Sequence, residues 1–359
     1  MLKRALPWLC VLVLGFTPCL AAEPPSAVAG ATATAASREP AIGSFFANPQ
    51  YSDAKLSPDG ALVAVRVKRA NRDALVVIDL ADSSRTKVVA HYADGDIGHF
   101  EWVNNNRLIF DTTDNQLALG ERYHAAGLFA VDRDGSNVLP LASRTPYIDK
   151  GKKDTPYLPG QTYMMSQAGA QNSDSVYVIK QTFDEYYEPD GYDLYLVNTL
   201  TTHATKVPSK HIVQCWVLDH KGEPRLAIST EMGVTAIYHI EPETKVWRKL
   251  VDFPAYKGGA GAFSPLGFGP DGTLYVSAHQ GKDKLGLYRY DLANARIDPS
   301  PVLQVDDYDF DGELIASADK LLGVQLLTDG ESDVWFDPAM KALQAKIDTL
   351  LPETVNLIT

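Results

Sequence analysis

A unit made of one tight turn and several short strands repeats along this sequence, and it limits the possible folds more than any other feature. The first copy runs from Leu56 to Ala90 and opens with Ser57-Pro58-Asp59-Gly60. Proline fixes φ near the value that such a turn needs, and glycine accepts a positive φ, so these four residues predict a tight turn. Beyond the turn, Val63, Val65 and Val67 alternate with other residues. That period of two predicts a strand with one buried face.

Four further copies follow in the same order of strands and turns. They span Trp102 to Leu141, Ser175 to Pro208, Trp216 to Val251 and Phe268 to Val305. A period of roughly 40–50 residues is typical of four-stranded propeller blades. The sequence therefore predicts an all-β fold, a β-propeller of four-stranded blades, with five clear blades and a partial sixth from Glu313 to Leu327.

The first 41 residues differ in composition from the repeats. Met1 to Arg4 is basic, the stretch to Leu20 is apolar, and Ala21-Ala22 offers small residues for cleavage. This order predicts a secretory signal peptide over residues 1–22; the apolar stretch is too short and too rich in proline to favour a membrane anchor. Residues 23–41 are rich in Ala, Pro, Ser and Thr, which predicts a disordered linker. We therefore expect the propeller domain at residues 42–359 and a secreted or periplasmic location.

The last segment departs from the repeat. Asp337-Pro338 predicts the start of a helix, with aspartate as the N-cap and proline in the first turn. Met340, Leu343 and Ile347 recur at helical spacing, so one short helix is expected near the C-terminus. Val355 to Thr359 is expected to open another strand. A chain that stops on such a strand is expected to form an incomplete propeller.

Charge and cysteine content exclude several classes of partner. The net charge is −12 and the isoelectric point is about 5.1. Nucleic-acid-binding proteins carry basic patches, so we expect no nucleic acid partner, and no membrane contact once the signal peptide is removed. Two of the three cysteines, Cys10 and Cys19, lie in the predicted signal peptide. Cys215 remains alone, so no internal disulfide is expected, and we expect it to be buried within the apolar strand Ile212 to Leu218.

Several motifs outside the turns are shared with one known family. They are Phe45–Tyr51, Leu75–Leu80, the stretch Gly95–Trp102 before Asn106-Arg107-Leu108, and Phe336-Asp337-Pro338 with Leu351-Pro352. Through them, residues 42–359 resemble the N-terminal β-propeller of the prolyl oligopeptidase family of serine peptidases. The nearer branch is the secreted acylaminoacyl-peptidase and dipeptidyl-aminopeptidase-like group.

The resemblance implies a division of labour. In that family the propeller is the non-catalytic part, and a following α/β-hydrolase domain carries the catalytic serine, aspartate and histidine. The propeller restricts access, so that short peptides are cut and folded proteins are excluded. A closed ring in that family has more blades than are counted here. We therefore expect an open or smaller ring whose exposed edges lead to marginal stability or self-association.

No catalytic residue is identified in this chain. The serine of an α/β-hydrolase lies in G-x-S-x-G on a sharp strand-to-helix turn, and the sequence contains no such motif. Gly135-Ser136-Asn137 lacks the second glycine, and Ser136 is predicted to lie in a hairpin turn. The sequence thus favours a chain that is not an enzyme by itself and that needs no cofactor. Its implied partners are a peptide substrate and an α/β-hydrolase domain, in cis or in trans. The alternative is a free-standing periplasmic propeller that binds a protein or peptide, as the TolB-type propeller does.

Two glutamates are the candidate substrate-binding residues. Glu185 and Glu188 belong to an acidic and aromatic cluster, Asp184 to Asp190. In dipeptidyl peptidases of the resembled family, propeller glutamates hold the free amino terminus of the substrate, and the resemblance gives these two residues that role. The alternative interpretation is an exposed hairpin loop with its tyrosines packed at the base.

Residues Asp307 to Gly312 match the first half of a calcium-binding loop. The acidic residue expected at the twelfth position is Ala318 instead, so we expect a solvated loop between blades and no bound metal. His91, His99 and His124 lie near expected blade edges, and their spacing does not indicate a metal site.

Overall fold

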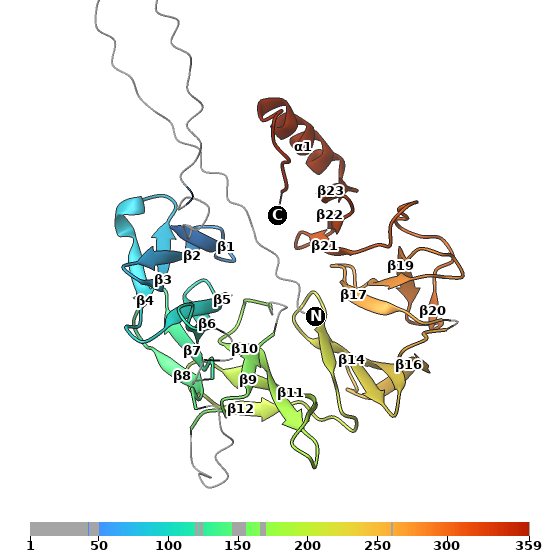
Figure 1. Ribbon diagram of the computed structural model, residues 1–359, viewed down its shortest axis with the longest axis horizontal. Coiled ribbons are helices and arrows are strands. Elements are labelled where there is room, and N and C mark those ends of the chain that lie inside the picture. The colour runs from blue at the N-terminus through green and yellow to red at the C-terminus, as the bar shows by residue number, and fades with distance from the viewer. Residues whose placement is uncertain are drawn as a thin grey trace, which may run out of the picture.

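The computed structural model describes residues 42, 50–118, 121, 125–145, 156–165, 170–259 and 261–358. Over these residues the chain forms six antiparallel sheets, arranged as six propeller blades and followed by one short helix (Figure 1). The predicted all-β propeller is confirmed. The predicted signal peptide, the linker and the segment Phe45–Pro49 lie outside the described residues, and the domain boundaries stay predictions.

Each blade is a simple meander of neighbouring strands. The first blade holds β1 (Tyr51–Leu56), β2 (Leu62–Arg69), β3 (Arg72–Asp79) and β4 (Lys87–Ala90). The second holds β5 (Asp96–Asn104), β6 (Arg107–Thr113), β7 (Leu128–Asp132) and β8 (Leu139–Ala142). The third holds β9 (Thr162–Met164), β10 (Ser175–Phe183), β11 (Pro189–Asn198) and β12 (Ala204–Lys206).

The later blades follow the same plan. The fourth holds β13 (Cys215–Leu218), β14 (Pro224–Glu231), β15 (Val234–Ile240) and β16 (Trp247–Pro254). The fifth holds β17 (Ser264–Phe268), β18 (Leu274–Ala278), β19 (Gly286–Asp291) and β20 (Arg296–Ile297). The sixth holds β21 (Gly312–Ala316), β22 (Leu321–Leu327) and β23 (Glu331–Trp335), and α1 (Pro338–Leu350) follows it.

The alternating valines of the first repeat lie in β2, but both faces of this strand are partly buried. Ala64 and Val65 point to opposite faces, and their exposed fractions are 0% and 4%. A blade packs against neighbours on its two faces, so a central strand buries residues of both parities. The sequence pattern predicted only one buried face, and this expectation was wrong.

The repeat also begins one strand earlier than the sequence indicated. β1 precedes the turn at Ser57 and pairs with β2, with a bulge between Ser52 and Ala54. Asp53 in this bulge has φ of 59°. The strand alternates polar and apolar residues weakly and is interrupted by the bulge, so its period of two was not visible in the sequence.

The sixth blade is partial, as predicted, and has three strands. Its third strand, β23, was not predicted, because Glu331, Ser332 and Asp333 hide the apolar alternation. The expected strand at Val355 is wrong: residues 355–358 form no strand. The backbone N–H of Ile358 instead donates to Asp333 Oδ2 at 2.7 Å, which holds this tail against the side chain of a β23 residue.

Helix α1 is confirmed at the predicted position. Asp337 Oδ1 accepts the backbone N–H groups of Ala339 at 2.9 Å and Met340 at 3.1 Å, as an N-cap does. No residue of α1 is buried, and the exposed fractions of Leu343 and Leu350 are 43% and 69%. The helix projects from the sixth blade in Figure 1. Within the described part of the chain, no helix is both long and apolar enough to cross a membrane.

The hydrophobic core lies between neighbouring blades. Five apolar clusters each join two successive blades, from the first and second to the fifth and sixth. Phe100, Trp102 and Phe110 are among the largest side chains of the cluster between the first and second blades. None of these five clusters joins the sixth blade to the first. In Figure 1 the first blade lies on the left side of the ring and the sixth blade at its upper right. The seams between successive blades therefore carry most of the apolar burial.

Candidate functional site

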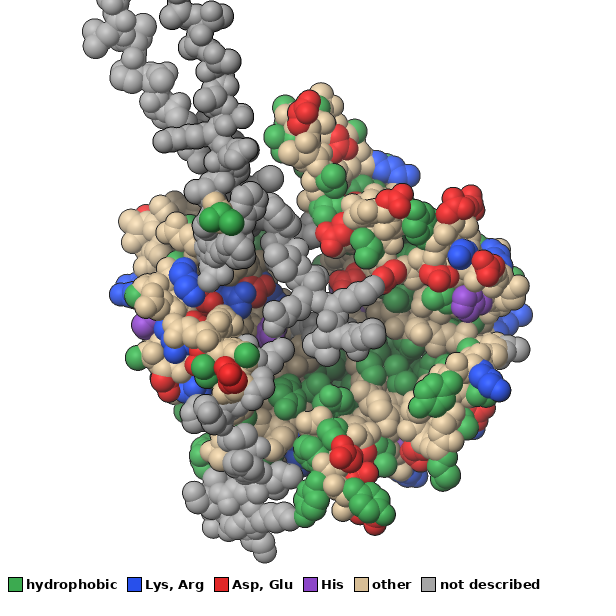
Figure 2. Space-filling model, in the orientation of Figure 1, with side chains coloured by type: hydrophobic (Ala, Val, Ile, Leu, Met, Phe, Trp, Pro, Cys, Tyr) green, Lys and Arg blue, Asp and Glu red, His purple; other side chains and the backbone are tan. Residues whose placement is uncertain are grey.

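The first strands β1, β5, β17 and β21 lie toward the middle of the ring, and the fourth strands β4, β8, β16 and β20 lie at its margin (Figure 1). Contacts of β17 with both β13 and β21 agree with this order. Figure 2 shows the face of the ring hollowed in the middle, with hydrophobic side chains gathered there. Exposed side chains on the inner strands are therefore the groups that a ligand in this hollow would meet.

His99 on β5 is one such side chain. It is 84% exposed, and its Nδ1 lies 3.1 Å from Asp111 Oδ2 on β6. The backbone N–H of His99 also donates to Asp111 Oδ1, at 2.7 Å. The carboxylate therefore fixes the orientation of the ring and turns Nε2 away from β6, as carboxylates do for functional histidines in other proteins.

The residue before His99 fits this arrangement only as glycine. A Cβ on Gly98 would lie 2.0 Å from Asp111 Oδ1, so any larger residue would displace the carboxylate. The carbonyl of Gly98 accepts a hydrogen bond from Arg66 Nη1 at 2.9 Å. Arg66 Nε donates to Ser52 Oγ at 3.2 Å, and Arg66 Nη2 lies 3.6 Å from Asp53 Oδ2. β1 and β2 of the first blade are thereby tied to β5 of the second.

A further ion pair lies along the same seam. Lys55 Nζ on β1 contacts Glu101 Oε1 on β5, and the indole N–H of Trp102 donates to the Lys55 carbonyl at 2.9 Å. Six charged or ionisable residues of the first two blades thus lie along one side of the middle of the ring. We call this set the charged inner wall: Asp53, Lys55, Arg66, His99, Glu101 and Asp111.

The charged inner wall has the chemistry of a polar binding surface. Arg66, Lys55 and His99 offer hydrogen-bond donors, and the three carboxylates offer acceptors. Over the residues that the structure describes, no group of three or more His, Cys, Asp and Glu is arranged to hold a metal ion. A ligand in the hollow would meet both donors and acceptors along this wall.

The Asp111 carboxylate raises the pKa of His99 above its ordinary value of 6.5, chiefly by its hydrogen bond to the ring. We expect Asp111→Asn to bring the pKa of His99 back down, because the amide cannot stabilise the imidazolium in the same way. An NMR titration of the histidine ring signals measures this, with exposed His203 as the internal control. An unchanged pKa of His99 in Asp111→Asn would contradict the assignment.

The same shift sets the sign of the pH dependence of stability. A histidine whose folded-state pKa is raised stabilises the fold at low pH, and this contribution is lost as the pH rises through the raised pKa. The exposed ring is screened by water, so the contribution is expected to be small.

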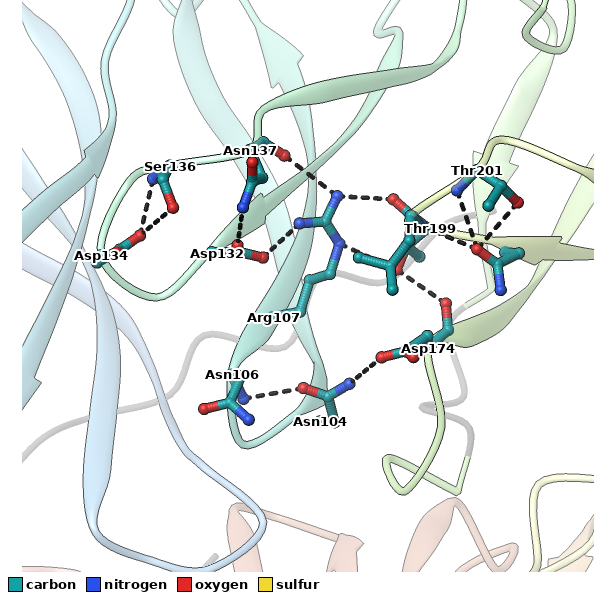
Figure 3. Close-up of polar contacts among 12 residues, drawn as sticks. Asn104, Asn106, Arg107, Asp132, Asp134, Ser136, Asn137, Asp174, Thr199 and Thr201 are labelled. Atoms are coloured by element: carbon teal, nitrogen blue, oxygen red, sulfur yellow. Dashed lines mark hydrogen bonds and ion pairs between the residues drawn. The ribbon is translucent and has the colours of Figure 1, made fainter.

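Arg107, a charged side chain outside the inner wall, is almost completely buried, at 1% exposed (Figure 3). Its Nε donates to Thr199 Oγ1 at 3.0 Å, and Nη2 donates to the carbonyls of Thr199 at 2.6 Å and Asn137 at 3.2 Å. Nη1 forms an ion pair with Asp132. All three guanidinium nitrogens have a partner, so this group joins the second blade to the third, and its burial keeps it out of reach of a ligand.

Ser136 lies in the turn between β7 and β8, as predicted for a hairpin (Figure 3). Its Oγ donates to Asp134 Oδ1 at 2.6 Å, and its backbone N–H donates to the same oxygen at 2.9 Å. These hydrogen bonds lower the pKa of the Asp134 carboxyl. The hydroxyl therefore closes a turn on the surface.

Glu185 and Glu188, the candidate substrate-binding residues, lie in the turn between β10 and β11, and all residues from Asp184 to Glu188 are exposed. Asp184 Oδ1 accepts the backbone N–H groups of Tyr186 at 2.8 Å and Glu188 at 2.9 Å. The exposed fractions of Tyr186 and Tyr187 are 76% and 63%. The described contacts do not bring either glutamate to the inner wall, and their role in substrate binding stays a prediction.

The residues of the expected acidic loop make separate contacts. Asp309 Oδ1 accepts the backbone N–H of Leu285 at 2.8 Å, and Tyr308 donates to Asp329 at 2.5 Å. Phe310 is buried in the cluster between the fifth and sixth blades. The segment thus connects two blades by one carboxylate and one aromatic ring.

Cys215 was expected to be buried, and this was wrong. It is a free, exposed cysteine at the start of β13, while Trp216 beside it is buried with its N–H donating to the Tyr192 carbonyl at 2.8 Å. Burial nevertheless raises the pKa of the thiol. A side chain on an inner strand can touch solvent and still be crowded by protein, which reconciles the two observations.

The inner wall was missed in the sequence because its parts are separated along the chain. His99 was identified only as a residue near a blade edge, and Asp111 lies twelve positions later. The β5–β6 register pairs Ile97 with Thr112 and Phe100 with Phe110, which brings Asp111 opposite His99. A hairpin predicted at residues 96–113 would have placed His99 opposite Asp111 from the sequence alone. Of the other two histidines, His91 is exposed and His124 lies outside the described residues.

A cavity of about 450 Å³ lies between the segment after β16 and the β18–β19 turn. Its lining includes Tyr256, Lys257 and His279, none of which the sequence had indicated. Tyr256 is 97% exposed, so the cavity is an open depression on the surface.

Similarity to known proteins is found among solved structures. No known family model and no curated protein matches this sequence. Among solved structures, the chain is similar to the β-propeller domain of the Trilobed protease from Pyrococcus furiosus, with 14% identity, coverage of 80% of this chain and 86% of that one, and a TM-score of 0.43.

Two other solved structures are similar to the same extent. The acylaminoacyl peptidase of Pyrococcus horikoshii has 16% identity and a TM-score of 0.44, with 83% of this chain and 47% of that one covered. An oligogalacturonate lyase in complex with manganese has 16% identity and a TM-score of 0.49, with 80% and 77% covered. The chain thus spans about half the length of that peptidase.

Proposed function

We propose that this chain is the non-catalytic, substrate-gating propeller of a secreted serine peptidase of the prolyl oligopeptidase family. Hydrolysis of the peptide bond would come from an α/β-hydrolase domain, in cis or in trans. The sequence resemblance supplies the family, and the charged inner wall supplies the observation that carries the gating role.

The inner wall supports gating because it offers both polarities where a peptide would pass. An extended peptide presents backbone N–H and C=O groups along its length, and each needs a partner when water is displaced. His99, Arg66 and Glu101 provide such partners on one side of the ring, while the hollow gathers apolar side chains. A folded domain keeps its backbone groups paired internally and would gain no such partners, so the ring would favour an extended peptide.

The test begins with the DNA downstream of the Thr359 codon. If it encodes a hydrolase domain with G-x-S-x-G, that domain is expressed with and without this chain, and cleavage of short peptides is compared with cleavage of a folded protein. We expect the propeller to leave short-peptide cleavage intact and to suppress cleavage of the folded protein. Equal cleavage of both substrates with the propeller present would overturn gating.

Unrelated downstream sequence would instead support the free-standing binding propeller. Cell fractionation tests the predicted secreted or periplasmic location separately, because either function requires export. Recovery of the intact chain, signal segment included, from the cytoplasm alone would contradict export.

A further inference from the structure

The turn between β13 and β14, Asp219–Glu223, lies in the middle of the ring (Figure 1). We call it the central turn. It is internally rigid, because Asp219 Oδ1 accepts the backbone N–H groups of Lys221 at 2.8 Å and Glu223 at 2.9 Å. Asp219 Oδ2 also pairs with Arg225 Nη2 at 2.7 Å, and both side chains are largely buried. These contacts hold the central turn in one compact shape.

On one side the central turn is pressed against the third blade. A Cβ on Gly222 would lie 2.3 Å from the backbone nitrogen of Ala170, and φ of Gly222 is +74°. Tyr177 on β10 faces the same turn: burial, and then the charge of Glu223, raises its pKa to about 12. The fit leaves no space between the turn and the third blade for a larger side chain.

On its other side the central turn reaches the sixth blade. His220 Nε2 lies 3.0 Å from the carbonyl oxygen of Ala318, in the turn between β21 and β22. This hydrogen bond bypasses the fifth blade, whose equivalent turn connects β17 to β18. One imidazole thus joins two blades that are not neighbours.

The β21–β22 turn, which accepts this hydrogen bond, is itself linked to α1. The backbone N–H of Ser317 donates to the Lys320 carbonyl at 2.9 Å, which closes the β21–β22 turn around Ala318. Lys320 Nζ lies 2.5 Å from Asp337 Oδ2, and Asp337 is the N-cap of α1. A continuous set of contacts therefore runs from the middle of the ring to a helix that has no buried residue.

We propose that the central turn obstructs one opening of the ring, that the His220–Ala318 hydrogen bond holds it there, and that displacement of α1 releases it through Lys320. This regulation rests on the proposed gating function, since it says how the gate is held shut. A displacement of α1 would shift the N-cap, draw the β21–β22 turn away and break the hydrogen bond. Little free energy is needed to shift this equilibrium, because the His220–Ala318 contact is a single hydrogen bond.

Amide hydrogen exchange of the purified chain tests the proposal without any ligand. In His220→Ala we expect exchange to become about three- to tenfold faster in both turns, 219–223 and 317–320, because the loss of one hydrogen bond frees both ends. His220→Gln can still donate from its amide and should stay close to the original rates. His203→Ala, in an exposed turn of the third blade, is the matched control.

A second pair of variants tests the link to α1. Lys320→Ala should speed exchange in the central turn as well as at the start of α1, whereas Lys346→Ala, further along the same helix, should leave the central turn unchanged. Faster exchange that is confined to the helix in Lys320→Ala would refute the coupling.

The remaining outcomes of the histidine variants are equally decisive. Faster exchange in the central turn alone, or no change in either turn, would overturn the proposal, because the two turns would then move independently. Faster exchange in every blade would also overturn it, since His220 would then support the whole fold. None of these results depends on peptide cleavage, so a failure of this inference can be told apart from a failure of the proposed function.

Discussion

Replacement of Arg107 by methionine is expected to lower the free energy of unfolding by about 3–5 kcal/mol, the range seen when one partner of a buried ion pair is removed. Methionine fills much of the same volume but leaves the Asp132 carboxylate without its cation. It also leaves the carbonyls of Thr199 and Asn137 without the donors that reach them at 2.6 and 3.2 Å. The loss falls on the seam between the second and third blades, since Arg107 and Thr199 lie on different blades.

Denaturant unfolding followed by tryptophan fluorescence measures this effect. Arg133→Met is the matched control, because Arg133 is an exposed arginine close in sequence and should change stability by no more than about 0.5 kcal/mol. Arg107→Lys is expected to fall between the two, as lysine keeps the charge but lacks the planar fork that reaches several partners at once. A loss below about 1 kcal/mol in Arg107→Met would show that the seam does not depend on this network.

Turn chemistry is the part of the fold that the sequence predicted best. Ser57 Oγ donates to Asp59 Oδ1 at 2.6 Å, and the backbone N–H of Gly60 donates to the Ser57 carbonyl at 2.8 Å, so the turn is determined by residues within four positions of one another. The N-cap of α1 is local in the same sense. Such features are legible because the residues that form them are adjacent in the chain.

The contacts between blades could not be read in this way. Arg107 and Thr199 are 92 positions apart, and in the sequence each is an ordinary polar residue. β1 and β23 were missed for a related reason: their polar residues are stabilised by neighbouring strands, and no apolar period marks them. The three-dimensional pairing decides what these residues do, and one sequence does not contain it.

The candidate site residues also differ in whether they lie close together in the sequence or meet only in the fold. Glu185 and Glu188 were chosen because they cluster in sequence, and the structure places them in an exposed turn. His99 and Asp111 form their pair only because the two strands of a hairpin face each other, with Gly98 leaving room for the carboxylate. His220 and Ala318 are 98 positions apart and meet only because the turns of the fourth and sixth blades lie side by side in the fold. The functional hypotheses of this protein therefore concern contacts between strands and blades.

Asp96→Asn is the second substitution with a large expected effect, a loss of about 2–4 kcal/mol in the free energy of unfolding. Asp96 is completely buried at the seam between the first and second blades. Its Oδ1 accepts the backbone N–H of Asp73 at 2.7 Å, and its Oδ2 accepts the backbone N–H of Asn115 at 2.8 Å and Arg72 Nη1 at 3.0 Å. An amide has one oxygen, so its NH₂ group must face at least one of these donors whichever way it turns.

Two features make Asp96→Asn informative about how the blades are joined. The substitution preserves size, so a loss of stability comes from hydrogen bonds and charge and not from a cavity. Asp94→Asn is the control two residues earlier: Asp94 is 70% exposed and pairs with Arg144 at 3.2 Å, a contact that contributes at most about 1 kcal/mol. Similar losses in the two variants would mean that burial of Asp96 adds nothing. A loss confined to Asp96→Asn would place the strength of this seam in its buried carboxylate, beside the apolar cluster of Phe100 and Trp102 that packs the same two blades together.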